Sequence, residues 1–174
     1  MNAMLQRTQV RRSMHHMKVN PVGKNASEAE WAYIAGFLDA DGAIIASIEH
    51  HKEKRHGFRV RVVIKATQSQ REILDWIREF TCVGLVRKNR TTFDWIVRDK
   101  KHTNELLLKL LPHLKVKKKQ AELAVQILVL PELSQNDFLL KAQTADALSR
   151  FNVRSKNRRK NYVTVVQDSF SRND

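Results

Sequence analysis

The chain has 174 residues, of which 42% are hydrophobic and 29% are charged, and its formal net charge is +14. This length suits one domain with a real core, and the charge predicts a polyanionic partner, with nucleic acid expected before an anionic membrane surface. No apolar run approaches the roughly 20 residues that cross a bilayer. The single cysteine, Cys82, excludes an internal disulfide and a cysteine zinc cluster, and we expect it to be a small buried residue.

The N-terminal residues 1–27 contain no acidic residue and five basic ones. This composition is typical of an organelle transit peptide, and it equally suits a flexible arm that binds DNA. We favour the arm. The compartment stays open between an organelle (chloroplast or mitochondrion) and a bacterial cytoplasm, because the segment has no apolar region of the kind that secretory signals contain.

A capping box formed by Ser27 and Glu30 predicts that the first helix begins at about Glu28. Four apolar residues recur at the helical period and form one stripe: Tyr33, Ile34, Phe37 and Leu38. Gly36 and Ala40 are four residues apart, so their face of the helix has almost no side-chain bulk. A second helix could therefore approach this face closely.

The same helix ends in two aspartates, Asp39 and Asp41, followed by Gly42, a residue typical of helix C-termini. A carboxylate at this end opposes the helix macrodipole and costs stability. A structural reason for Asp41 is therefore hard to find, and a bound metal cation would supply one.

After Gly42 the hydrophobic period changes to two, which predicts a hairpin with strands over residues 43–49 and 58–66. One face of this hairpin is apolar: Ile44, Ala46, Ile48, Phe58, Val60, Val62, Ile64 and Ala66. The opposite face carries Arg59, Arg61 and Lys65 and is therefore basic.

A second capping box, Ser69 with Glu72, predicts a helix that continues to about Phe80. Residues 85–90 and 92–98 then form a second hairpin, and further helices are expected at about 102–111, 117–130 and 135–152, the last capped by Ser134. We interpret 28–152 as one domain and the basic segment 153–174 as a C-terminal tail. The element order predicts an α+β fold, a four-stranded antiparallel sheet with helices on one face and an open, basic, concave face for nucleic acid.

The segment IAGFLDADG closely resembles the signature of the LAGLIDADG homing endonucleases, with Gly36, Phe37, Asp39, Asp41 and Gly42 in place. The chain has one copy, which is similar to the homodimeric, intron-encoded branch found in algal organelles. The resemblance implies the αββαββα fold over roughly residues 28–150. It also implies a homodimer that cuts both strands of a long pseudo-palindromic DNA site across the minor groove, leaving short 3′ overhangs. Ala40 replaces the commoner glycine.

The resemblance also implies roles for individual residues. One acid per subunit is a poor metal site, but two copies of Asp41 across a dimer axis, helped by the Ala40 carbonyl, would bind Mg²⁺, and we expect Mn²⁺ to substitute. Gln68 matches the glutamine that positions water, and Lys117 matches the basic residue near the scissile phosphate. Arg71 matches a second basic residue with a spacing that differs by one, and each of the three also suits an ordinary surface role. The expected dimer-interface residues are Gly36, Phe37, Ala40 and Asp39, with Asp39 capping the partner helix.

For DNA contacts we choose the face of both hairpins opposite the apolar residues: Ile45, Ser47, Glu49, Arg59, Arg61, Lys65, Arg87, Asn89, Asp94 and Ile96. A two-stranded ribbon fits the major groove, where Arg and Lys read guanine and Ser or Asn read several bases. The alternative is that Arg59 and Arg61 contact phosphates only. Lys118, Lys119 and the basic residues of 154–160 are expected to bind phosphates.

A second hypothesis is a non-cleaving RNA maturase or DNA-binding regulator with the same fold. Regulators of this family often lose the motif acid, so the presence of Asp41 favours catalysis. A basic RNA-binding protein of ribosomal type would explain the charge but not the paired aspartates.

Overall fold

The computed structural model describes residues 22–23, 27–54, 56–152 and 161–171. Its helices and strands are, in order, α2 (Glu28–Asp41), β1 (Gly42–His50), β2 (Phe58–Gln68), α3 (Arg71–Thr81), β3 (Leu85–Asn89), β4 (Thr92–Val97), α4 (Lys100–Leu110), α5 (Lys118–Val129), α6 (Gln135–Asn152) and α7 (Tyr162–Ser171). This order confirms the predicted α+β arrangement. Most of the proposed N-terminal arm, and the basic run 154–160, lie outside the described residues.

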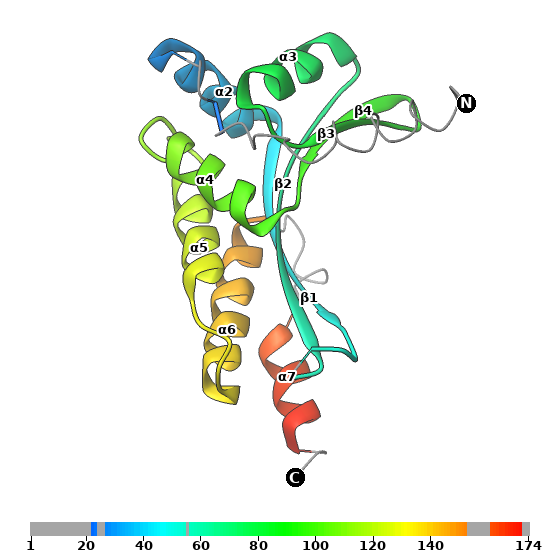
Figure 1. Cartoon of the computed structure of the whole chain (residues 1–174), viewed down its shortest axis with the longest axis vertical. Helices are drawn as coiled ribbons and strands as arrows, with labels where there is room; N and C mark the ends of the chain where they lie inside the picture. The colour runs from blue at the N-terminus through cyan, green and yellow to red at the C-terminus, as the bar shows by residue number, and fades with distance from the viewer. Residues whose placement is uncertain (1–21, 24–26, 55, 153–160, 172–174) are drawn as a thin grey trace, which may run out of the picture.

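The four strands form one antiparallel sheet in the order β1-β2-β4-β3. Figure 1 shows α4, α5 and α6 along one side of β1 and β2, while the β3–β4 hairpin projects away from these helices. The predicted alternation is confirmed, because Ile44, Val62 and Ile64 are buried against the helices and Ile45 is exposed. The opposite face of the sheet stays open.

Helix α2 anchors the core beside the sheet. Ser27 accepts from the Glu30 amide, and Glu30 accepts from the Ser27 amide, which confirms the first capping box. Trp31, Ile34 and Leu38 are buried, and each such side chain contributes about 1.5–3 kcal/mol. The predicted stripe was partly wrong, because Tyr33 is 53% exposed.

Two local predictions need correction. Helix α3 begins after Gln70, which makes no side-chain cap hydrogen bond, because β2 keeps the chain extended to Gln68 and Ser69 cannot cap the helix. Cys82 is exposed, because it ends α3 in the left-handed conformation with φ 58°. Gly42 is the C-cap of α2, as the sequence predicted. Its backbone is extended, and its small size is needed because a Cβ would lie 2.6 Å from the Leu38 carbonyl oxygen.

The proposed N-terminal arm is in part docked. Val22 is buried in the main core, and the Gly23 amide donates to the Thr81 carbonyl at 3.0 Å. Gly23 has φ +58°, and a Cβ there would collide with the Trp31 ring, so only glycine fits this turn. The arm therefore meets the domain just ahead of α2.

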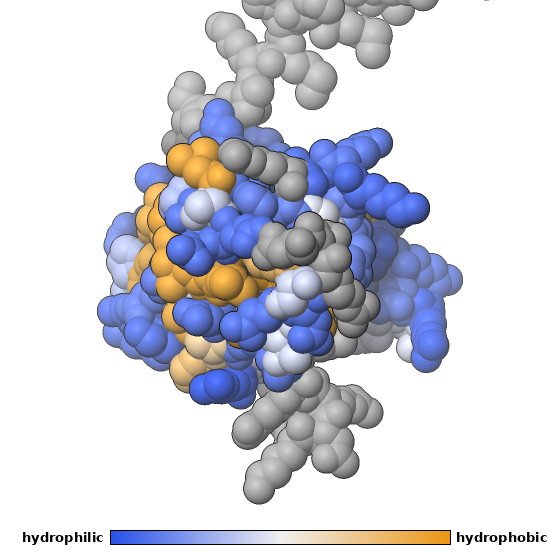
Figure 2. Space-filling model, turned by 90° about the horizontal axis from the view of Figure 1, so that it is seen from below, coloured by the Kyte–Doolittle hydropathy of each residue, from blue (hydrophilic) through white to orange (hydrophobic). Residues whose placement is uncertain are grey.

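Helix α7 lies within the segment predicted as a tail, so that prediction was wrong for residues 162–171. Asp146 of α6 accepts from the amides of Tyr162 and Val163 at 2.8 and 3.1 Å, which caps α7. Val166 and Phe170 then pack with Phe58, Phe138 and Ala142 in a second apolar cluster. Figure 2, seen from the end that carries α7, shows that some apolar surface remains there among polar side chains.

Candidate active site and nucleic-acid interface

The β1–β2 hairpin brings the end of α2 to the end of β2. Gly42, the first residue of β1, pairs with Ala66, so the preceding Asp41 lies beside the residues that follow Ala66. Gln68 Nε2 donates to Asp41 Oδ2 at 2.6 Å. The structure therefore brings together two residues that the resemblance assigned to catalysis.

The end of α2 offers oxygen ligands to a cation. Asp41 and Ala40 are both exposed. Among the described residues of one chain, no group of three or more His, Cys, Asp or Glu side chains could hold a metal ion. Carboxylate and carbonyl oxygens suit a hard divalent cation such as Mg²⁺ or Ca²⁺, and the residues fit such an ion if a second copy completes the shell.

Asp39 has a different role from Asp41. Its carboxylate accepts from the backbone amides of Lys115, Val116 and Lys117 at 2.7, 3.0 and 2.8 Å. Burial opposes ionisation of Asp39, but these amide donors outweigh it and hold the pKa of the carboxyl below its usual value. The prediction that Asp39 caps the partner helix is corrected, because it caps the chain entering α5 of its own subunit.

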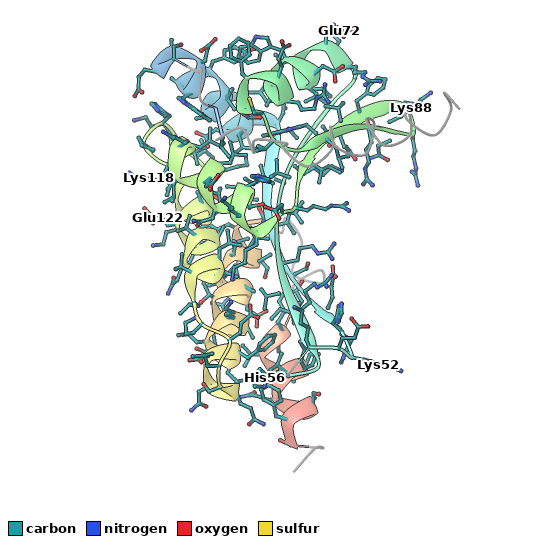
Figure 3. The ribbon with its side chains drawn as sticks, viewed as in Figure 1. Lys52, His56, Glu72, Lys88, Lys118 and Glu122 are labelled. Atoms are coloured by element: carbon teal, nitrogen blue, oxygen red, sulfur yellow. The ribbon has the colours of Figure 1, made fainter. Side chains whose placement is uncertain are left out.

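Lys117 lies at the same junction. It is the N-cap residue of α5, is half-buried, and its Nζ donates to the backbone carbonyl of Asp39. This contact places the Lys117 ammonium next to the motif, two residues from Asp41. Lys118 and Glu122 instead lie on the side of α5 that faces away from the sheet (Figure 3).

Arg71 is not brought into this group by its observed contacts. Its Nε pairs with Asp75 at 2.8 Å, one helical turn along α3, and its guanidinium lies 5.9 Å from the centre of the Phe93 ring. The structure therefore supports Arg71 less strongly than Gln68 and Lys117 as a residue of the site.

The exposed face of α2 is small and apolar. A Cβ added at Gly36 would meet no atom within 4 Å, and Ala40 is exposed one turn later. Tyr33 on this helix packs edge-on against Trp76 of α3, with ring centroids 5.3 Å apart. Beside these rings lies a hollow of about 420 Å³ with an apolar lining, so the face is suited to contact with another helix.

The open face of β1 and β2 carries most of the predicted DNA contacts. Ser47 and Arg61 pair across the strands, as do Glu49 and Arg59. Arg61 lies 3.6 Å from Glu49, and both are partly exposed. Figure 3 places Lys52 at the tip of this hairpin and Lys88 at the tip of the second, so basic residues mark both hairpin tips.

Asp94 and Ile96 were predicted to contact DNA, and the structure corrects this, because they are 0% and 2% exposed. Asp94 lies on the central strand β4 and accepts from Thr67 at 2.7 Å, while Lys65 and Arg87 approach it at 3.0 and 3.9 Å. Burial opposes ionisation, but the hydrogen bonds from Thr67 and Lys65 outweigh it and lower the pKa of Asp94. Asp94 therefore holds the side chains of Lys65 and Arg87 in position and is too buried to contact DNA itself.

Sequence reasoning missed Thr67 and Asp146. Thr67 shares its strand face with Lys65, and the register with β4 sets it opposite Asp94, so alternation within β2 was the available signal. Asp146 had no such signal, because its partners in α7 lie 16 and 17 residues along the chain.

Comparisons with known proteins agree with this geometry. A family model described as LAGLIDADG endonuclease matches residues 34–127. The chain is 34% identical over 146 residues to DNA endonuclease I-CreI of Chlamydomonas reinhardtii, spanning 80% of this chain and 89% of that protein. It is 34% identical over 119 residues to DNA endonuclease I-CvuI of Chlorella vulgaris, spanning 66% and 74%.

The fold is also similar to solved structures. I-CvuI in complex with its target in the presence of 2 mM Ca superposes with a TM-score of 0.76 at 29% identity, covering 83% of this chain and 94% of that one. Archaeal I-Vdi141I complexed with DNA has a TM-score of 0.73 at 22% identity, a likeness of fold. By its sequence match and its relatives, the chain belongs to the LAGLIDADG endonuclease family.

Proposed function

We propose that this protein is a site-specific double-strand DNA endonuclease that uses a divalent cation. The observation that carries the proposal is the exposed Asp41 carboxylate, hydrogen-bonded to Gln68 beside the open basic face of the sheet. The relatives I-CreI and I-CvuI are DNA endonucleases, and I-CvuI was solved on DNA in the presence of Mg or Ca. No helix of the described residues is long and apolar enough to cross a membrane.

The cation would be Mg²⁺, with Mn²⁺ as a substitute, held by Asp41 and the Ala40 carbonyl from two subunits and by DNA phosphate oxygens. Such an ion polarises the scissile phosphodiester and favours deprotonation of an attacking water. Because Asp41 is exposed at the end of its helix, its carboxylate is open to a ligand from outside the chain.

Gln68 would orient the attacking water. Its Nε2 is engaged by Asp41, so its Oε1 is the group that can accept a hydrogen bond from that water. Lys117 would stabilise the negative charge that develops on the phosphate, since only one of its three donors is used by the Asp39 carbonyl. Arg71 would add positive charge through its terminal nitrogens, because the pair with Asp75 uses Nε.

The active form would be a homodimer joined through α2. The exposed Gly36 and Ala40 allow two copies of the helix to approach closely, with Phe37 beside them. This arrangement would place two Asp41 carboxylates near the dimer axis, one for each DNA strand. Cleavage across the minor groove would then leave short 3′ overhangs.

Recognition would use the ribbon face in the major groove. The side chains that remain accessible there are Ile45, Ser47, Glu49, Arg59, Arg61, Lys65, Arg87 and Asn89. Arg87 and Lys65 would reach DNA with their positions set by Asp94. The two-fold symmetry of the dimer would make the target pseudo-palindromic.

The test is to incubate the protein with a randomised duplex library in Mg²⁺ or in Ca²⁺ and to sequence the new ends. We expect discrete ends with 3′ overhangs and a two-fold symmetric preference, in Mg²⁺ and not in Ca²⁺. Selective binding with no ends in either cation would contradict the endonuclease and would favour the non-cleaving maturase or regulator.

A further inference from the structure

A cavity of about 500 Å³ lies beside the part of β2 that β4 does not cover. β4 pairs with β2 only from Ile64 to Gln68, so β4 leaves the edge of β2 before Ile64 unpaired. The cavity wall is made by residues 59–62 of β2, the connection from β4 to α4, and residues of α5 and α6. None of the lining residues belongs to the α2 motif.

The lining is strongly cationic. Six basic residues line it: Lys54, Arg59, Arg61, Arg98, Lys100 and Lys141. Only two acidic residues, Asp99 and Glu132, accompany them, which leaves an excess of four positive charges around one cavity. Aliphatic side chains from β2 and α5 complete the wall. Like charges gathered at a partly enclosed site repel one another, so an anion in the cavity would be favourable.

Lys141 makes this site more than a charged surface. Its side chain is 1% exposed, and its Nζ donates to Glu132 at 2.6 Å. Among the described residues, the Glu132 carboxylate is the one hydrogen-bond acceptor of the Lys141 ammonium, which has three donors. Burial lowers the pKa of Lys141 although Glu132 opposes this effect. An apolar residue in place of such a pair is often neutral or stabilising, so stability alone does not explain the lysine.

The surroundings of the pair point the same way. Burial alone would raise the pKa of the Glu132 carboxyl, but the contact with Lys141 lowers it below its usual value. The nearby charges of Lys100 and Lys54 add to this lowering. The Glu132 carboxylate thus lies among three lysines, and Arg59 and Arg61 of β2 also line the cavity. A compact anion with several acceptor oxygens would satisfy donors that Glu132 cannot reach.

We propose that this cavity binds a phosphate group, separately from the cleavage site. A phosphate offers oxygens in several directions to lysine and arginine donors, and such charge-assisted hydrogen bonds are the strong ones. The group is either a backbone phosphate of bound DNA or a free phosphate or mononucleotide, and the cavity recognises the same chemistry in both. The proposal does not depend on cleavage by Asp41.

The experiment measures the thermal unfolding midpoint of the full chain as sodium phosphate, and separately a deoxynucleoside monophosphate, replaces sodium chloride at constant ionic strength. Binding to the folded state raises the midpoint by mass action. Lys100→Ala should weaken phosphate binding about tenfold. Its matched control is Lys101→Ala, the adjacent lysine of α4, which pairs with Glu105 and does not line the cavity.

A second variant tests the buried pair. Lys141→Met combined with Glu132→Gln removes both charges together, so no isolated charge is left buried and the protein should fold. The net charge of the lining is unchanged, and the response to phosphate should weaken because the buried Lys141 donor is lost. Equal phosphate responses in the natural chain, Lys100→Ala and Lys101→Ala would overturn the proposal. So would a double variant that folds and keeps the full response.

The source of the phosphate is separated by a third arm, run without divalent cations so that no cleavage occurs. If a saturating unrelated DNA duplex abolishes the phosphate response, the cavity takes a backbone phosphate. If duplex and phosphate raise the midpoint additively, it takes the free group. Because no arm requires cutting, failure of the phosphate site and failure of the proposed endonuclease give different results.

Discussion

Asp41 at the end of α2 and Asp94 in the β3–β4 hairpin are both carboxylates, but their environments are opposite. Asp41 is exposed and accepts a hydrogen bond from Gln68. Asp94 is fully buried and is surrounded by Thr67, Lys65 and Arg87. The first charge is left available for a ligand from outside the chain, whereas the second is used within the sheet.

The difference in burial suggests different roles for the two residues: catalysis for Asp41 and structural support for Asp94. An exposed carboxylate such as that of Asp41 contributes little to folding, which is consistent with the catalytic role that we propose for it. A buried carboxylate among basic side chains holds those side chains in place on the face that we assign to DNA. Replacing each one should therefore affect different measurements.

The largest expected effect is on cleavage by Asp41→Asn. Loss of the anionic metal ligand should lower the cleavage rate at least about a thousandfold, because metal catalysis contributes several kcal/mol. The unfolding midpoint and target binding should stay close to those of the natural chain, since Asp41 is exposed. Cleavage assays in Mg²⁺ with binding measured in parallel check this, and a variant that still cuts would remove Asp41 from the site.

Gly36→Leu should break the dimer while leaving each subunit folded. A side chain at Gly36 meets open space within one subunit, and leucine is a good helix former. In the proposed dimer the same side chain would separate the two α2 helices, so sedimentation should show monomers and cleavage should be lost. A dimer that survives this change would place the interface elsewhere.

Asp94→Asn should lower the free energy of unfolding by about 1–2 kcal/mol, because Lys65 and Arg87 lose their anionic partner at a buried site. The value is moderated by the partial exposure of both basic side chains. Asp75→Asn is the matched control, since Asp75 pairs with Arg71 at the surface and should cost about 0–1 kcal/mol. Chemical denaturation measures the free energy of unfolding of both variants. Equal losses of stability would show that Asp94 does not support the sheet more than a surface aspartate does.

The smallest effect concerns pH. The pKa of Asp94 is lowered in the folded protein, so the stability from its ionised form is present above the unfolded value of about 3.9 and is lost as pH falls through the folded value. Asp94→Asn should lack this part of the acid sensitivity. Denaturation midpoints at neutral pH and below about pH 4 measure it, and the gap between variant and natural chain should narrow in acid.

The sequence alone determined features that depend on neighbours along the chain. The capping box of Ser27 and Glu30 and the predicted bounds 135–152 both hold in the structure, because caps and helical periodicity act over a few residues. Alternation in β1 and β2 gave the correct buried and open faces for the same reason. The motif indicated Asp41 and the wider family resemblance indicated Gln68, and closure of the β1–β2 hairpin explains why the two side chains meet.

Tertiary structure decided the rest, because partners far apart in the chain set the environment of a side chain. Asp39 turned inward because the amides entering α5, some 76 residues later, need an acceptor. Asp94 was buried by side chains from two neighbouring strands, which alternation on one strand cannot reveal. Lys141 lines a cationic cavity only because the fold brings α6 together with residues of β2 and of the connection from β4 to α4. Spacing along the chain can identify candidate residues of a site. The burial of those residues and the charges around them are set only when helices and sheet pack together.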